Sequence, residues 1–511
     1  MTDRTNALAV VLAIGVSTVS FAWNTRVAAG SDAFGYVSQA DLWLKGNLFI
    51  DQSFAADVPW PMARWTFTPL GYRPEVDGFR IVPAYAPGLP LLMAAGKWIA
   101  GACAVYWIVP LAAGLLVLAT FAIGRLVAQP LVGLGAAWLI ATSPTVLFMS
   151  MAPMSDVPAA AAWATATALV LFSATAAANA NASMISAAVG GLAAGLAILI
   201  RPNLAPLAAV LALWLITRRQ FVGVSVFAVF ASAGGIAVAV INVRLYGSAL
   251  RSGYDLTDAF AMANVVPNLA RYGRWLVEAE TPIALGSLVW LAWTRRWLLV
   301  TLVAAVWASY LLYVPWDAWW YLRFLLPAWP MMAVGSALLL TRLPRSGAVA
   351  AFVALGLIGV AQAWRRDAFH EAAGESKYVE VARVVESLTN PNAVIISAQH
   401  SGTLRYYAGR MTLRWDVGDP AWLDRTVSWL AAHGRDPYLV LEETEIDALR
   451  AKAGSSSIVA RVDWTPMVAF RGGAVKLFDA VNREPGQPVV QNKASLTVDG
   501  CPANKWIGMP R

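Results

Sequence analysis

Charged residues are scarce in this sequence. Asp, Glu, Lys and Arg make up 13% of the 511 residues, against roughly 25% in soluble domains. Apolar residues make up 59%, against roughly 45–50%, and the mean hydropathy is +0.58. A chain of this composition has too little polar surface to cover itself in water, so a protein that is soluble over its whole length is excluded.

Cysteine and histidine are rare as well. The two cysteines, Cys103 in an apolar segment and Cys501 near the C-terminus, offer neither a disulfide framework nor metal-ligand spacing. Three histidines speak against a histidine-based metal cluster. The net charge of +8 does not indicate nucleic acid as a partner, because many arginines stand at the ends of apolar runs and no basic run is interleaved with aromatic residues.

Long uncharged apolar runs are what the sequence has in abundance. They recur up to Trp364, and each can cross roughly 30 Å of hydrocarbon as a helix. We therefore expect a polytopic α-helical membrane protein with about eleven transmembrane helices, the first an uncleaved signal anchor. The predicted spans are 7–23, 104–126, 130–148, 157–177, 184–200, 203–217, 220–242, 281–294, 297–315, 323–341 and 347–364.

After Trp364 the composition becomes that of a soluble protein. We expect a membrane domain over 1–364 with outer loops at 24–103 and 243–280, a small α/β domain over 365–480, and an irregular tail over 481–511. The predicted strands of the α/β domain are 393–398, 437–441, 456–462 and 474–479, and its predicted helices lie near 375–389, 420–433 and 443–452.

Arginines in the short loops predict the orientation. With a cytoplasmic N-terminus, the loops around Arg125, Arg218–Arg219, Arg295–Arg296 and Arg342 all face the cytoplasm, and only Arg26 opposes this arrangement. The long loops and the C-terminal domain then face the side of the membrane opposite the cytoplasm. The apolar run 89–100, which Lys97 interrupts, is placed on the outer interface, because a further span there would invert every later loop.

Charged residues beside the predicted spans are the informative ones, because a charge at the centre of a membrane helix costs about 2.5–3.5 kcal/mol. Asp32 follows the first span, Asp156 precedes the fourth, Arg201 ends the fifth and Arg323 opens the tenth, all on the outer side. Two carboxylates and two guanidiniums can thus converge on one outward-facing site. A carboxylate can take a proton from a hydroxyl, and a guanidinium can hold a phosphate by paired hydrogen bonds.

Each of these residues also has a structural interpretation. The segment Ser155–Pro158 is a good helix start, so Asp156 could be an N-cap, a role that can coexist with a functional one. Arg201 before a proline could be a charge at a helix end, and Asp32 could be a polar loop residue. Arg323 could be an interfacial anchor that extends to the lipid headgroups.

Five short motifs carry a resemblance to a known family. They are Asp32 with Tyr36, Tyr85-Ala-Pro-Gly88, Met154-Ser-Asp-Val-Pro158, Gly195-Leu-Ala-Ile-Leu-Ile-Arg-Pro202 and Tyr321-Leu-Arg-Phe-Leu-Leu-Pro327. In this order, over roughly residues 8–364, they resemble the GT-C glycosyltransferases, in the branch of the bacterial lipid A aminoarabinose transferase and the protein O-mannosyltransferases. The C-terminal segments 398–402 and 405–407 resemble uncharacterised bacterial members of the same superfamily.

The resemblance implies an enzyme of the bacterial plasma membrane that takes a sugar from a polyprenyl-phosphate carrier and transfers it, with inversion, to an acceptor hydroxyl on the outer face. The acceptor is a lipid, a glycan or, as the least favoured of the three, a protein. Asp32 corresponds to the catalytic base and Asp156 to a second acidic residue of the cavity. The residues expected near the carrier phosphate and the substrates are Arg201, Arg323, Tyr36, Tyr85 and Tyr321. No cofactor is implied with certainty, and a divalent cation held by the two carboxylates stays open.

Two departures from the family limit what the resemblance implies. Tyr85-Ala-Pro-Gly88 stands where the aminoarabinose branch has a Lys-Pro-Pro element, which leaves the donor sugar open. Ala33 follows Asp32 where the protein O-mannosyltransferases have a second acidic residue, so protein mannosylation is not supported. The alternative functions are a secondary transporter or lipid flippase and a membrane scaffold, but transporters keep their charged sites near the midplane of repeated halves.

The arginine pattern yields a test of the orientation. We expect the C-terminus to lie outside, so alkaline phosphatase fused after Arg511 should be active and a fluorescent reporter that folds only in the cytoplasm should be dark. The opposite pattern would place the charged residues on the cytoplasmic side and remove the basis for an outward-facing site.

Overall fold

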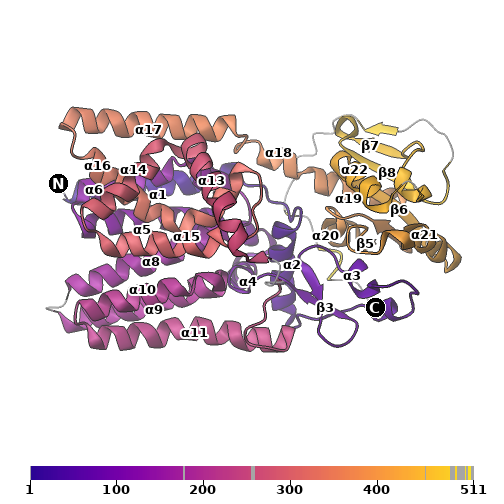
Figure 1. Cartoon of the computed structure of the whole chain (residues 1–511), viewed down its shortest axis with the longest axis horizontal. Helices are drawn as coiled ribbons and strands as arrows, with labels where there is room; N and C mark the ends of the chain where they lie inside the picture. The colour runs from indigo at the N-terminus through magenta and orange to yellow at the C-terminus, as the bar shows by residue number, and fades with distance from the viewer. Residues whose placement is uncertain are drawn as a thin grey trace.

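Long helices fill one part of the molecule and a mixed β-sheet fills the other (Figure 1). This computed structural model describes residues 2–176, 179–254, 259–454, 456–483, 489–491, 501 and 504–507. The N-terminus and the sheet lie at opposite ends of the helix bundle, with the elements of the first outer loop between the bundle and the sheet.

Within the described residues, seven helices are long and apolar enough to cross a membrane. They are α1 (Thr2–Ala22), α5 (Ile108–Val127) with η2 (Ala102–Tyr106) before it, α8 (Asp156–Thr175), α9 (Ala180–Ile200), α11 (Phe221–Tyr246), α16 (Trp329–Leu340) with η6 (Trp319–Ala328) before it, and α17 (Arg345–Arg365). An eighth candidate is the bent pair α6 (Pro130–Ala141) and α7 (Pro144–Ser150). The predicted polytopic helical fold is confirmed.

The number of full-length spans differs from the prediction. Three of the eleven predicted spans correspond to shorter apolar helices, namely α10 (Pro206–Thr217) with η3 (Pro202–Leu204), α14 (Pro282–Trp293) and α15 (Trp297–Leu311). Proline opens α10 and α14, which fixes where these helices begin. The predicted bounds 203–217 and 281–294 lie within a residue of the observed ones, whereas the predicted span 297–315 runs past the end of α15 at Leu311.

The predicted span 130–148 is wrong as one straight helix, because the chain bends by 59° between α6 and α7. Pro144 ends α6, and the Ser143 side chain caps α7 by accepting a hydrogen bond from the Val146 amide at 3.3 Å. Glu280, from the turn η5 (Leu276–Glu280), accepts hydrogen bonds from Ser143 Oγ at 2.8 Å and from the Thr145 amide at 3.2 Å. A carboxylate placed at a helix N-terminus stabilises this break.

Burial separates central from peripheral helices. In α8, 78% of the apolar window is buried, against 22% in α11 and 17% in α17. The inner face of α11 packs closely on α9 through small residues, because a side chain at Gly234 of α11 would overlap the backbone of α9 at Gly195. The exposed apolar side chains of α11 and α17 are therefore the surface expected to contact lipid.

The helix directions place the arginine loops at one end of the bundle. Helices α5, α10, α14 and α16 run away from the sheet domain, and the helix that follows each of them returns (Figure 1). The connections that hold Arg125, Arg218–Arg219, Arg295–Arg296 and Arg342 consequently share the end that carries the N-terminus.

The outer loops form structure of their own. The first contains α2 (Asp32–Lys45), η1 (Ser53–Ala56), α3 (Ala63–Thr66), α4 (Gly88–Ala100) and an antiparallel sheet of β1 (Ile50–Asp51), β3 (Arg80–Pro83) and β2 (Tyr72–Pro74). The second contains η4 (Met262–Asn264) and α13 (Val265–Trp275) before η5. The helix α4 covers the run that the sequence places at the interface, and it packs against α2.

The predicted C-terminal α/β domain is confirmed as a six-stranded mixed sheet of order β5-β4-β6-β8-β7-β9. Its strands are β4 (Ala393–Ile396), β5 (Met411–Leu413), β6 (Asp436–Glu442), β7 (Val468–Phe470), β8 (Val475–Asp479) and β9 (Val489–Gln491). Its helices and turns are α18 (Glu371–Glu375), α19 (Lys377–Leu388), α20 (Ser401–Thr403), η7 (Leu404–Ala408), η8 (Pro420–Trp422), α21 (Leu423–Ala432), α22 (Glu443–Ala453), α23 (Ile458–Arg461) and η9 (Arg471–Gly473).

Two details of this domain differ from the sequence analysis. The predicted strand 456–462 is wrong, because Ser457 caps the short helix α23 and the Asp424 carboxylate accepts hydrogen bonds from the amides of Ile458 and Val459. The segment 481–511, expected to be irregular, contains the strand β9, which pairs with β7. The remaining residues of that segment up to Gly500 lie outside the described residues, apart from Val481–Arg483.

The two cysteines form a disulfide bond, which the sequence analysis did not expect. Cys103 in η2 and Cys501 have Cα atoms 5.3 Å apart, although 398 positions separate them in the chain. A lone pair of cysteines at such a separation has no recognisable spacing, so only the fold could reveal the pairing.

The sheet domain docks directly on the first outer loop. The Tyr407 hydroxyl accepts a hydrogen bond from the Ala28 amide at 2.7 Å, and Ser401 Oγ accepts one from the Leu70 amide at 3.2 Å. A side chain at Gly402 would overlap the ring of Phe34 in α2. The segments 398–402 and 405–407, to which the sequence assigned no chemistry, thus contribute the contact between this domain and α2.

Candidate functional site

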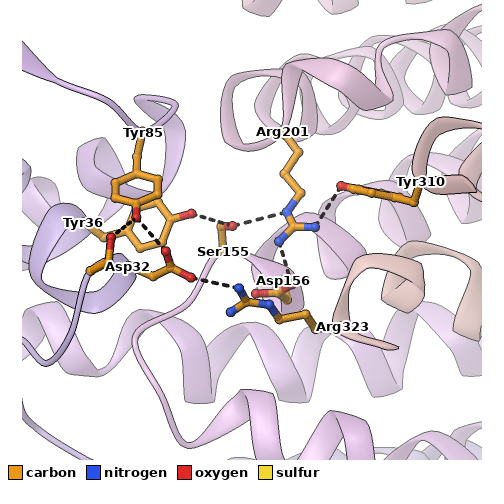
Figure 2. Close-up of polar contacts among 9 residues, drawn as sticks. Asp32, Tyr36, Tyr85, Ser155, Asp156, Arg201, Tyr310 and Arg323 are labelled. Atoms are coloured by element: carbon orange, nitrogen blue, oxygen red, sulfur yellow. Dashed lines mark hydrogen bonds and ion pairs between the residues drawn. The ribbon is translucent and has the colours of Figure 1, made fainter. Parts of the chain in front are cut away.

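Asp32 is the first residue of α2, at the end of the bundle that faces the sheet domain (Figures 1 and 2). Its Oδ1 atom accepts a hydrogen bond from the Tyr85 hydroxyl at 2.6 Å, and its Oδ2 atom lies 2.9 Å from Arg323 Nη2. The Asp32 side chain is 32% exposed, so solvent or a substrate can reach the carboxylate. Ser31 does not cap the helix with its side chain, because its hydroxyl is 2.8 Å from that of Tyr85.

A glycine in the first turn of α2 makes room for Tyr85. The Tyr85 ring lies where a side chain at Gly35 would be, so the hydroxyl can reach Asp32. Burial, and then the neighbouring Asp32 carboxylate, raise the pKa of the Tyr85 hydroxyl well above its ordinary value. Tyr85 therefore stays protonated and donates its hydrogen bond to the carboxylate.

Arg201 is the centre of a second, buried set of contacts. It follows the last residue of α9 and donates hydrogen bonds to Asp156 Oδ1 at 2.6 Å, to the Tyr310 hydroxyl at 2.9 Å and to Ser155 Oγ at 3.2 Å. All three nitrogens of the guanidinium are thus engaged. The Tyr36 hydroxyl donates to the same Ser155 oxygen at 2.9 Å, which connects this set of contacts to α2 (Figure 2).

Asp156 is the first residue of α8, and its side chain is 0% exposed. Ser155 occupies the N-cap position but makes no side-chain capping bond, because its hydroxyl serves Tyr36 and Arg201. Asp156 Oδ2 has no hydrogen-bond partner among the described residues. The Ser155–Pro158 segment is therefore a helix start, as the N-cap interpretation has it, but the side chains of Ser155 and Asp156 bond to other groups instead of capping the helix.

The start of α4 fixes the position of Arg201. A side chain at Gly88 would overlap the backbone of Leu199 and Ile200, so α4 packs directly against the end of α9. Gly88 is the last residue of the Tyr85-Ala-Pro-Gly motif, and this motif consequently brings Tyr85 and Arg201 to the same place.

Arg323 belongs to η6, ahead of α16. Its guanidinium carbon lies 5.4 Å from the ring centre of Tyr321 and 5.3 Å from that of Phe324, and its side chain is 14% exposed. The Nε atom is buried and has no hydrogen-bond partner in the part of the chain that the structure describes. Unlike Arg201, Arg323 therefore has hydrogen-bond donors that are not engaged.

The structure brings six of the seven residues predicted from the sequence together in two neighbouring sets of polar contacts, which meet where the rings of Tyr36 and Tyr85 lie 4.7 Å apart (Figure 2). They are Asp32, Tyr36, Tyr85, Asp156, Arg201 and Arg323. Tyr321 lies beside these contacts, with its ring stacked on that of Trp316 at 5.6 Å between centres. Sequence reasoning missed Ser155 as a contact and Tyr310 altogether, since a tyrosine near the end of an apolar helix is common at a membrane interface.

The site residues do not fit a divalent cation. A protein site for magnesium or calcium needs several oxygen ligands around one point. Asp32 and Asp156 are each paired with an arginine, and the described residues contain no group of three or more His, Cys, Asp or Glu side chains that could hold a metal ion. We therefore assign no step to a metal.

Comparison with known proteins identifies the fold. No protein-family model and no curated protein matches the sequence. Among solved structures, the chain is similar to ArnT from Cupriavidus metallidurans in the apo state, with a TM-score of 0.58 and 14% identity over 94% of this chain and 98% of that one. The similarity to ArnT bound to undecaprenyl phosphate gives a TM-score of 0.57 and 14% identity over 93% and 99% of the chains.

A second similar protein is the archaeal oligosaccharyltransferase AglB from Archaeoglobus fulgidus, in complex with an inhibitory peptide and a dolichol-phosphate. The TM-score is 0.53, with 11% identity over 87% of this chain and 70% of that one. ArnT and AglB are both members of the GT-C superfamily. The chain therefore has the GT-C fold, and the resemblance drawn from its motifs is confirmed at the level of the fold.

The buried ion pair yields a stability prediction. Arg201→Met should lower the free energy of unfolding by about 3–5 kcal/mol, because it leaves the Asp156 carboxylate buried without a cation. The double variant Arg201→Met with Asp156→Asn should regain most of this loss, since the buried charge is gone as well. Denaturant unfolding in detergent would measure both, and equal stability of the single and double variants would contradict the role of this pair.

Proposed function

We propose that this chain is an inverting glycosyltransferase that moves a sugar from a polyprenyl-phosphate carrier to an acceptor hydroxyl on the outer face of the membrane. The observation that supports it most is the partly exposed pair of Asp32 and Arg323, in which the carboxylate is open to a substrate and the guanidinium has donors without a partner among the described residues. Solved proteins of the same fold carry undecaprenyl phosphate or dolichol-phosphate.

The outward orientation of the site has two independent supports. The arginine loops lie at the opposite end of the bundle from Asp32, as the positive-inside rule requires of an outward-facing site. The Cys103–Cys501 disulfide lies on the same side as the site, and disulfides persist in oxidising compartments such as the bacterial periplasm.

Asp32 is the proposed general base. The acceptor hydroxyl gives its proton to the Asp32 carboxylate while its oxygen bonds to the anomeric carbon of the sugar. The bond from that carbon to the carrier phosphate breaks at the same time, and its electrons leave with the polyprenyl phosphate. Attack and departure take place on opposite faces of the carbon, so the configuration inverts. General-base catalysis of this kind contributes roughly 10²–10⁴ in rate.

Arg323 is the proposed ligand of the carrier phosphate. Among the described residues its Nε has no partner and its terminal nitrogens bond only to Asp32, whereas every nitrogen of Arg201 already donates to a protein group. A guanidinium binds phosphate through two parallel hydrogen bonds and stabilises the charge that develops as the phosphate departs. Tyr321, whose ring lies against Arg323, would line the same subsite.

Asp156 and Arg201 have a different proposed role. With 0% and 11% exposure, this pair is too enclosed to receive a substrate proton. It fixes the ends of α8 and α9 and, through Ser155 and Tyr36, the first turns of α2. We therefore assign Asp156 and Arg201 to positioning, together with Tyr36, and we assign Tyr85 to orienting the Asp32 carboxylate.

A transporter is the second function considered from the sequence, and the location of the charges favours it less. Transporter sites lie near the middle of the bilayer on interrupted helices. Here Asp32, Asp156, Arg201 and Arg323 all stand at helix ends beside the outer loops. The donor sugar, whether hexose or pentose, and the acceptor, whether lipid or glycan, stay open in this proposal.

The proposed base gives the first test of function. Asp32→Asn should lower sugar transfer by about 100-fold or more, because the amide keeps the shape but cannot take a proton. Binding of the polyprenyl-phosphate sugar should be retained. Asp317→Asn is a matched control, since this aspartate is 68% exposed and pairs only with arginines of α13 among the described residues. Transfer by Asp32→Asn above roughly a tenth of the parent would exclude Asp32 as the base.

The proposed phosphate ligand gives the second test. Arg323→Lys should weaken donor binding about tenfold or more, which corresponds to about 1.4 kcal/mol, because an ammonium does not form the paired hydrogen bonds of a guanidinium. Arg274→Lys, at a 55% exposed arginine of α13, is the control that should keep donor affinity and turnover. Unchanged donor affinity in Arg323→Lys would return Arg323 to the role of an interfacial anchor.

A further inference from the structure

The C-terminal segment of the chain lies on α2, the helix that begins with Asp32. We call Cys501 and Asn504–Ile507 the C-terminal strap. The Cys103–Cys501 disulfide ties the strap to η2, at the base of α5. The Lys505 amide donates a hydrogen bond to the Tyr406 carbonyl at 2.7 Å, which joins the strap to the sheet domain as well. The strap is thus attached both to η2 and to the sheet domain.

Asp41 is the point on α2 where three parts of the molecule meet. Its Oδ2 atom accepts hydrogen bonds from Asn504 Nδ2 of the strap at 2.7 Å and from the Tyr406 hydroxyl at 3.2 Å. Its Oδ1 atom pairs with Lys97 of α4. The Asp41 side chain is 8% exposed, so these partners must offset the free-energy cost of burying its carboxylate.

Trp506 of the strap covers the first turn of α2. Its ring stacks on that of Phe34 with 5.7 Å between centres and meets the ring of Tyr72 edge-on at 5.0 Å. The guanidinium carbon of Arg405 lies 5.5 Å from the same indole ring. Phe34 is fully buried and stands two residues after Asp32. The indole of Trp506 therefore packs against the same helical turn that carries Asp32.

The position of α2 matters because a general base such as Asp32 must lie close to the hydroxyl whose proton it takes. A general base acts within hydrogen-bond reach, about 2.6–3.2 Å, and a misplacement of about 1 Å can cost about 100-fold in rate. α2 is a 14-residue helix in an outer loop, and contacts with its neighbours rather than a passage through the bundle hold it in place. A shift of Phe34 or Asp41 moves Asp32 with it, because a short helix moves as a unit.

We propose that the C-terminal strap is a positioning element of the active site: anchored by the Cys103–Cys501 disulfide, it holds α2 where Asp32 meets Arg323 and the acceptor. Asp41 and Trp506 are the positioning residues on either side of this contact. The effect of the strap on catalysis rests on the proposed function. Its effect on the position of α2 does not depend on that function.

The disulfide provides a reversible test. Dithiothreitol reduces the bond to two thiols and is itself oxidised to its cyclic disulfide. Cys103→Ser, Cys501→Ser, the double variant and the reduced parent should all lose about tenfold or more in kcat, with the KM for donor within twofold of the parent. The double variant should be no worse than either single variant, since each removes the same bond. A kcat equal to that of the oxidised parent in all of them would overturn the proposal.

The indole provides a test that leaves the disulfide intact. Trp506→Ala should lower kcat by a similar factor, and Trp506→Phe should restore most of it, because a phenyl ring can still stack on Phe34. Activity is measured at least 10 °C below the melting temperature of each variant, so that a loss of stability alone does not lower kcat. Parental kcat in Trp506→Ala under these conditions would mean that the strap contributes only stability, which would overturn the proposal.

Hydrogen exchange of the α2 amides separates this proposal from the proposed function. Peptides that cover 33–41 should exchange faster in Cys501→Ser and in the reduced parent, while peptides of the buried helix α8 should not change. If these peptides exchange faster in Cys501→Ser and in the reduced protein but the oxidised parent transfers no sugar, the strap is upheld and the glycosyltransferase function is removed. If the parent transfers sugar and the variants show unchanged exchange and unchanged kcat, the glycosyltransferase function is upheld and the strap proposal is overturned.

Discussion

The Asp156 carboxylate is fully buried, and burying a carboxylate is costly unless a cation lies against it, so much of the site depends on meeting that requirement. The cation is Arg201, and it in turn needs partners for its remaining donors. The Tyr310 hydroxyl and Ser155 supply them, which joins α15, the end of α9 and the start of α8 at one point. Through the Ser155 hydroxyl this junction extends to Tyr36, and so to the helix that carries Asp32.

The second ion pair has the same chemistry in different surroundings. Asp32 is 32% exposed where Asp156 is 0% exposed, and the Arg323 Nε atom has no partner among the described residues where every nitrogen of Arg201 makes a hydrogen bond. A buried pair held by several further hydrogen bonds is rigid, whereas a partly exposed pair with an unused donor can exchange a partner for a ligand. Two neighbouring aspartate–arginine pairs can therefore have different roles: the Asp156–Arg201 pair holds the helices, and the Asp32–Arg323 pair receives the substrates.

Much of this arrangement could be predicted from the sequence, since apolar runs define helices and charges at their ends define a face. Asp32, Asp156, Arg201 and Arg323 stand out because charge is rare near the spans. Ser155 and Tyr310 do not stand out, because their importance comes from the partner each meets. The break at Pro144 depends on Glu280, and the helix at 458–461 depends on Asp424. Such contacts join residues that are far apart in the chain, so a local sequence pattern cannot predict them.

The disulfide also imposes an order on the assembly of the protein. A chain is synthesised from its N-terminus at roughly 5–20 residues per second, so Cys501 emerges some tens of seconds after Cys103. In that interval the membrane helices can insert and pack, but α2 has no Trp506 against Phe34 and no Asn504 against Asp41. The helix that carries Asp32 is thus among the first parts of the protein to be made and among the last to receive all its contacts, and a ribosome that stops early leaves a membrane protein whose site is unfinished.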